Sequence, residues 1–80
     1  MKSLTEKYAV EALNNNVATF HDVLKIFVEV CLYDAREARH YTDKIHNAGR
    51  AVCYWGSKEE CEFVIAAFKS ILVNCNLLEN

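Results

Sequence analysis

The chain of 80 residues contains no proline and only two glycines. These residues most often mark loops and linkers, so their scarcity leaves little room for a second domain. No apolar run approaches the roughly 18 residues that a membrane-spanning helix needs. The first four residues, 1–4, are followed by charges, whereas a secretory signal peptide continues with an apolar core. We therefore expect one cytoplasmic domain over residues 1–80, with a short tail at residues 1–7 and no membrane partner.

The chain also lacks a cluster of Lys and Arg, and its formal net charge is −2. Nucleic acids are bound mainly through basic patches, so no nucleic-acid partner is expected. The cysteines form no C-x-x-C pair, the spacing typical of metal and redox sites, and each lies among apolar residues. We therefore predict no metal, no cofactor, and cysteines that serve as small core residues. These are Cys31, Cys53, Cys61 and Cys75.

Catalytic motifs are absent as well. A nucleophilic enzyme needs a nucleophile, a neighbouring base and a site for the developing charge. No such motif surrounds His21, His40 or His46, and no Gly-rich phosphate loop is present. The chain is therefore not expected to be an enzyme.

What is present is enough apolar material for a packed core, since hydrophobic residues make up 52% of the chain. The run Tyr8–Leu13 is followed by three consecutive asparagines. Asparagine bonds its own backbone and tolerates turn geometry, so this run is predicted to be a strand that stops at a turn. Thr19 suits a helix N-cap, and apolar residues then recur at helical spacing from Phe20 to Cys31.

A second helix is predicted two or three residues later, where Asp34 can cap it. Its apolar stripe runs through Ile45, and Gly49 stands where a helix commonly ends. The segment Arg50–Trp55, rich in β-branched and aromatic residues, is predicted to be the second strand.

Ser57 and Glu60 form the pattern of a capping box, which predicts a third helix whose apolar side reaches Leu72. The pair 77–78 would form a short closing strand. The order is strand, helix, helix, strand, helix and a possible final strand. Such a chain is expected to be α+β, with its helices packed on one face of a short antiparallel sheet.

His46 lies near the end of the second predicted helix and shares a face with Ile45 and Thr42. If the helical pair folds onto the sheet, this face and the asparagine turn form one small cavity. Its floor would be apolar, and its rim would carry amide and imidazole groups. A plainer alternative also stays open, in which the asparagines only make a turn and His46 is a half-buried polar residue.

Two blocks of the sequence resemble the ClpS family of Clp protease adaptors. Residues 14–20 (NNNVATF) resemble an N-D-D-x-x-T/P-M/F block that follows the first strand. Residues 45–53 (IHNAGRAVC) resemble a V-H-x-x-G-K/R-A block that leads into the second strand. The separation of the blocks matches without a gap, and the resemblance extends over Tyr8–Phe68. It implies a ClpS-like sandwich.

The resemblance also implies a function. ClpS-like adaptors bind N-degrons, which are proteins that begin with Leu, Phe, Tyr or Trp, and deliver them to a Clp AAA+ unfoldase of the ClpA or ClpC type. Asn14 and His46 match the residues that bind the substrate's α-amino group and first peptide unit, and Asn15 and Asn16 match two aspartates beside them. The positions that match the side-chain pocket are Ala18, Phe20, Val23, Thr42, Ile45 and, across a gap, Leu77.

Some positions depart from the family's pattern. Losing a charged acceptor at the asparagines would weaken amine binding by about 1 kcal/mol. Thr42 replaces a larger gate residue, which would admit bulkier or β-branched first residues. Glu59 and Glu62 match acidic positions near the unfoldase-binding face, but Val64 stands where the family often has Lys.

Two other functions remain open. In the first, the chain is a ClpS mimic that occupies the unfoldase without delivering substrate. The small number of residues before Tyr8 and the loss of the aspartates favour this alternative. The other is a generic interaction domain that keeps the fold without the pocket, since the same layout resembles the C-terminal domain of the ribosomal stalk protein.

Overall fold

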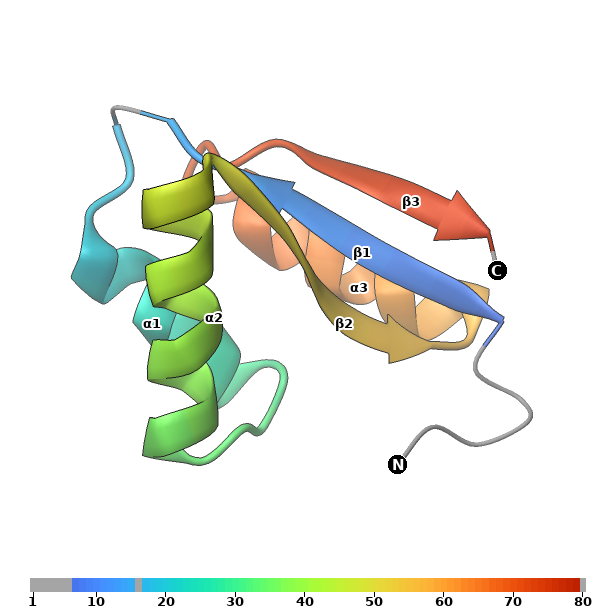
Figure 1. The fold of residues 1–80 in the computed structure, drawn as a ribbon. Coiled ribbons are helices and arrows are strands. Elements are labelled where there is room, and N and C mark those ends of the chain that lie inside the picture. The colour runs from blue at the N-terminus through green and yellow to red at the C-terminus, as the bar shows by residue number, and fades with distance from the viewer. Residues whose placement is uncertain (1–6, 16, 80) are drawn as a thin grey trace.

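The computed structural model of the chain describes residues 7–15 and 17–79. Asn16 and all of the predicted tail except Lys7 lie outside these described residues. The elements are β1 (Tyr8–Leu13), α1 (Phe20–Glu29), α2 (Ala35–Ala48), β2 (Arg50–Gly56), α3 (Lys58–Lys69) and β3 (Cys75–Glu79) (Figure 1).

The helix ends follow the predicted capping chemistry. Thr19 and Ser57 each form a capping box with the third residue of their helix, and Asp34 accepts a hydrogen bond from the backbone of α2. Gly49 closes α2 in the left-handed region, with φ of 87°. The side chains at N-caps satisfy backbone N–H groups that have no partner inside the helix, so these four residues fix where the helices begin and end.

The three strands form an antiparallel sheet in the order β2-β1-β3, which confirms the closing strand. The register shifts between Val10 and Glu11, which pair with Tyr54 and Val52 and leave Cys53 as the extra residue of a β-bulge. The hydroxyl of Tyr33 donates to the Cys53 carbonyl at 2.7 Å, so the bulge still satisfies its backbone.

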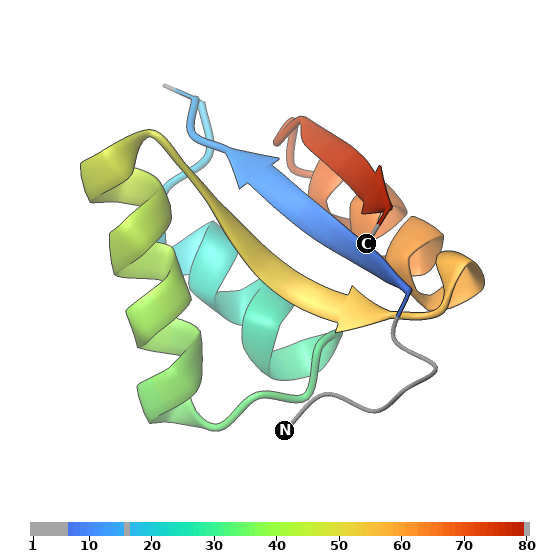
Figure 2. The same ribbon diagram turned by 45° about the vertical axis from the view of Figure 1, so that its right-hand side comes forward.

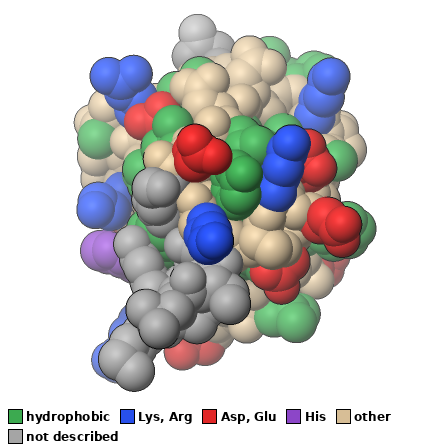
Figure 3. Space-filling view, turned by 90° about the vertical axis from the view of Figure 1, so that its right-hand side faces the viewer, with side chains coloured by type: hydrophobic (Ala, Val, Ile, Leu, Met, Phe, Trp, Pro, Cys, Tyr) green, Lys and Arg blue, Asp and Glu red, His purple; other side chains and the backbone are tan. Residues whose placement is uncertain are grey.

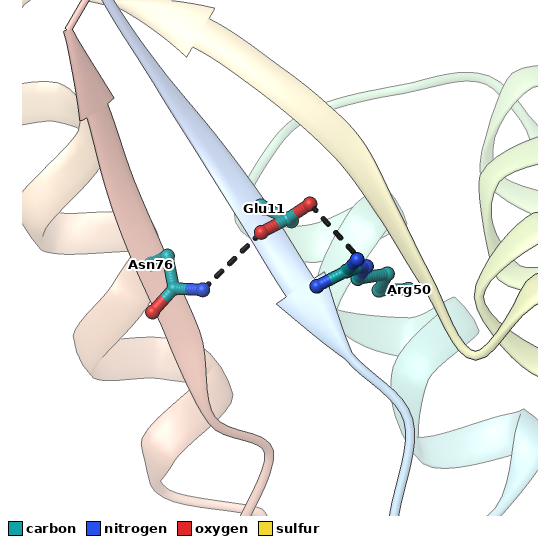
Figure 4. Close-up of polar contacts among 3 residues, drawn as sticks. All are labelled: Glu11, Arg50 and Asn76. Carbon is teal, nitrogen blue, oxygen red and sulfur yellow. Dashed lines mark hydrogen bonds and ion pairs between the residues drawn. The ribbon is translucent and has the colours of Figure 1, made fainter.

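Helices cover one face of this sheet, as predicted. In Figure 2, α1 and α3 lie behind the sheet and α2 runs beside β2. On the open face, the Glu11 carboxylate lies 3.9 Å from Arg50 Nε and accepts a hydrogen bond from the Asn76 amide at 3.2 Å (Figure 4). None of the helices in the described ranges combines the length and apolar character that a membrane crossing requires.

The core lies between the helices and the sheet. All four cysteines are free thiols, of which Cys31, Cys53 and Cys61 are buried and Cys75 is half-buried. Burial raises the pKa of Cys31 and Cys75 to about 12, helped in Cys31 by the nearby Cys75. The largest fully buried side chains are Phe27, Phe68, Ile45, Val10, Val64, Val73, Thr42, Cys53 and Cys61.

Two helices end earlier than predicted. Helix α1 was expected to continue to Cys31, but it ends at Glu29, and Leu32 adopts a φ of 61° in the longer connection that follows. Helix α3 was expected to reach Leu72, but it ends at Lys69. Leu72 has a φ of 66°, which reverses the chain. The apolar residues beyond each helix continue the helical spacing in the sequence, but their backbone is not helical. The spacing therefore predicted both helices to be longer than they are.

Candidate functional site

Three connections meet at one end of the sheet. The Leu13 N–H donates to the carbonyl of Asn74 at 2.9 Å, which joins the end of β1 to the connection between α3 and β3. The Asn14 N–H donates to the carbonyl of Gly49 at 2.8 Å, which joins the asparagine turn to the residue just before β2. The asparagine turn and the end of α2 are therefore neighbours, as the sequence predicted.

His46 is oriented by its own helix. Its Nδ1 lies 3.1 Å from the carbonyl oxygen of Thr42. A carbonyl only accepts, so the neutral ring carries its proton on Nδ1 and presents the lone pair of Nε2. The ring also contacts Phe20, with centroids 5.4 Å apart and planes inclined by 53°. His46 is thus a half-buried acceptor packed against an aromatic side chain.

The predicted pocket residues, which we call the apolar wall, differ in burial. Val23, Thr42 and Ile45 are buried, whereas Ala18 and Phe20 are half-buried. The Thr42 hydroxyl donates to the carbonyl of Ala38 at 2.7 Å, so its polar atom already has a partner within α2. The hydroxyl hydrogen of Thr42 is therefore not available to a ligand at this position.

Both polar atoms of the Asn15 side chain have partners within the fold. Its carboxamide oxygen accepts the N–H groups of Val17 at 2.9 Å and Ala18 at 2.8 Å. Its amide nitrogen donates to the carbonyl of Leu72. Asn14 is exposed, and Asn16 lies outside the described residues. The structure thus brings Asn14 and Asn15 close to the end of α2 but binds the side chain of Asn15 into the fold.

Leu77 lies away from this group. It pairs with Val10 across the sheet. Val10 is three residues before the end of β1, so Leu77 is roughly 10 Å along the strand from the turn. Leu72 is the leucine that contacts the turn, through its carbonyl. This contact was not predicted from the sequence, because Leu72 was placed on the third helix and no local pattern marks the contact.

The positions on α3 that match the unfoldase-binding face differ in exposure. Glu59 and Glu62 are exposed on α3, with exposed Phe63 beside them. Val64 is fully buried, so its match to a surface Lys has no bearing on a docking face. Figure 3 shows acidic and basic side chains interspersed on one side of the molecule, so neither sign dominates there.

Among the described residues, two open hollows are lined by side chains other than these. The larger, about 450 Å³, is lined by Asp34, Arg36, Glu37, His40 and Tyr41, at the opposite end of α2 from His46. The smaller, about 300 Å³, lies along α1. No group of three His, Cys, Asp or Glu side chains within the described ranges is arranged to hold a metal ion.

This end of the sheet thus combines three connections, an oriented imidazole and the aromatic ring of Phe20. Comparison with known families identifies the class of protein. The family described as ATP-dependent Clp protease adaptor protein ClpS matches residues 3–73. The chain therefore belongs to the ClpS family. A search of curated proteins found no match.

A solved structure supports the fold. Agrobacterium tumefaciens ClpS2, bound to L-phenylalaninamide, is similar with a TM-score of 0.81 and 17% sequence identity, over 95% of this chain and 99% of that one. At this identity the likeness concerns the fold. Family and fold together confirm the predicted ClpS resemblance and the α+β class. Because the family consists of adaptor proteins, the chain is an adaptor and not an enzyme.

Proposed function

We propose that the chain binds proteins with a bulky hydrophobic N-terminal residue and delivers them to a Clp AAA+ unfoldase. The observation that carries this proposal is the orientation of His46, whose Nε2 is an acceptor beside an apolar wall. A free α-amine is mostly protonated at neutral pH and only donates hydrogen bonds. Acceptors at the end of an apolar pocket are therefore what recognises a hydrophobic chain end.

The partners of the amine are His46 Nε2 and the side-chain oxygen of Asn14, which is exposed at the turn. Asn16 remains a predicted third partner. An internal peptide nitrogen carries one hydrogen and no charge, so it satisfies these acceptors less well. This difference is how the site would distinguish a chain end from an internal residue.

The apolar wall receives the first side chain. Burying a Leu or Phe side chain contributes roughly 1.5–3 kcal/mol. Phe20 is half-buried and available for this contact, whereas Val23 and Ile45 are buried and would have to be uncovered by the ligand. The similar ClpS2 structure holds L-phenylalaninamide, which offers a free amine, a benzyl group and an amide. That ligand has the chemistry that this wall and His46 would fit, which supports the proposal.

The experiment compares two peptides that begin with Phe and differ only in a free or acetylated N-terminus. Fluorescence anisotropy with each labelled at its far end gives both dissociation constants. We expect binding of the free peptide and a loss of at least about tenfold on acetylation, since a hydrogen bond to a charged group contributes about 1.5–3 kcal/mol. Equal or absent binding of both peptides contradicts the proposal.

One observation favours a second function, in which the domain occupies the unfoldase without holding a chain end. The rings of Phe20 and His46 already contact each other, which leaves a ligand less room between them. Degradation of an N-degron reporter by a Clp unfoldase and its protease separates the two functions. A delivering adaptor raises turnover, whereas a mimic binds the unfoldase and lowers it. Charge reversal at Glu59 and Glu62 tests whether α3 makes that contact.

A further inference from the structure

The carboxamide of Asn15 has no acceptor left for a ligand. An amide oxygen has two lone pairs, and the N–H groups of Val17 and Ala18 occupy both. The amide nitrogen only donates, and one of its hydrogens goes to the carbonyl of Leu72. Because an ammonium group also only donates, no atom of Asn15 can bind it while these contacts are kept.

The turn that contains Leu72 is joined to buried residues. Leu72 is in the left-handed region and is 63% exposed, while the next residue, Val73, is buried. The N–H of Leu72 donates to the carbonyl of Lys69 at 2.9 Å, and that of Val73 to the carbonyl of Phe68 at 3.0 Å. Phe68 is fully buried in α3. The turn that accepts the bond from Asn15 is therefore anchored to α3.

We propose that Asn15 is a positioning residue that ties the connection between β1 and α1 to the turn between α3 and β3, and that it does not touch the bound peptide. One side chain thereby holds the segment between Asn14 and Phe20 against the rest of the fold. The consequence for peptide affinity rests on the function proposed above. The consequence for the peptide-free protein does not.

The role requires an amide. An aspartate at position 15 would still accept from Val17 and Ala18, but it has no hydrogen for Leu72 when ionised. Its second oxygen would instead face the carbonyl oxygen of Leu72, and two acceptors repel each other. The asparagine that replaces the family's first aspartate thus exchanges an acceptor for a donor, and this exchange is what allows the contact.

The two roles for Asn15 predict opposite results for N15D. If Asn15 faces the amine, the added carboxylate attracts the ammonium, and the affinity for a peptide beginning with Phe rises. If Asn15 is a positioning residue, N15D loses the contact with Leu72, and the affinity falls by about fivefold or more. We expect the fall. Tighter binding of the free peptide by N15D, with the acetylated peptide unchanged, would overturn the proposal.

A second measurement needs no peptide. Amide hydrogen exchange followed by NMR reports the bonds to Val17 and Ala18 directly. N15A should accelerate exchange at both amides by about tenfold, because each loses its acceptor. N15D should keep most of this protection, since its carboxylate still accepts. Unchanged exchange in N15A, in a variant that melts cooperatively, would also overturn the proposal.

Asn74 provides the matched control. It is exposed two residues after Leu72, and its side chain forms no hydrogen bond with the described residues. N74D and N74A make the same chemical changes next to the same turn, and they should alter neither affinity nor exchange at Val17 and Ala18. If the unmodified chain binds no N-terminal Phe, the proposed function fails, and the exchange measurement still decides whether Asn15 holds the N–H groups of Val17 and Ala18.

Discussion

Replacing His46 with Ala should weaken the binding of an N-terminal Phe peptide much more than the binding of the same peptide without its amine. The bond from Nδ1 to the Thr42 carbonyl orients the ring and leaves Nε2 as the acceptor. A hydrogen bond between a neutral acceptor and a charged donor contributes about 1.5–3 kcal/mol. Its loss therefore corresponds to about 10-fold to 150-fold in the dissociation constant.

The assay is a double-mutant cycle by isothermal titration calorimetry. One peptide begins with Phe, and the other begins with a 3-phenylpropionyl group, which keeps the benzyl side chain and lacks only the amine. We expect H46A to weaken the first by at least about tenfold and the second by less than about threefold, a difference of roughly 0.7 kcal/mol or more. H46Q should recover part of the loss, because the side-chain oxygen of Gln also accepts.

His21 is the control, since it is exposed on α1. H21A should leave both dissociation constants unchanged. If H46A weakens both peptides by the same factor, His46 only packs against Phe20, and the assignment of Nε2 as the acceptor for the amine is refuted.

Three further predictions concern the scaffold. G49A should destabilise the protein by about 1–2 kcal/mol in urea unfolding, because Gly49 has a φ of 87° with no atom within 4 Å of an added Cβ, so the cost is that of the backbone alone. E11A should change stability by about 1 kcal/mol or less, since its partner Arg50 is largely exposed, and a larger loss would contradict this reasoning. Burial raises the pKa of Cys31 from 9.0 to about 12, so the unfolded thiol ionises first and stability should fall as the pH rises from 9 toward 12. Alkylation at pH 8, followed by mass spectrometry, should modify this thiol only after unfolding, whereas rapid alkylation of the folded chain would contradict its burial.

Local chemistry explains why most of the fold was predictable from the sequence. Thr19, Asp34 and Ser57 satisfy backbone groups within three residues of themselves, and Gly49 closes a helix by its own conformation. Each of these signals is complete within one short segment. The β-bulge at Cys53 was not predicted, because it depends on pairing with β1 and on the distant hydroxyl of Tyr33.

The site likewise has features that local sequence predicts and features that depend on distant residues. The neighbourhood of His46 and Thr42 follows from a spacing of four residues on one helix, so helical geometry alone brings them together. The closeness of Asn14 to Gly49 was predicted only on the condition that the helices fold onto the sheet, because it joins two segments that are far apart in the chain. Leu77 was assigned to the pocket across a gap, where no helical or strand spacing constrained the choice.

Asn15 shows why an aligned residue type does not fix the environment of a side chain. Its neighbour Asn14 has the same side chain, yet Asn14 is exposed and Asn15 bonds to Leu72. That contact exists because Leu72 leaves the helical conformation, which apolar periodicity did not predict. Because the end of this helix was predicted wrongly, the contact between Leu72 and a residue 57 positions away was not predicted either. Backbone conformation at connections decides which polar side chains are free to bind a ligand.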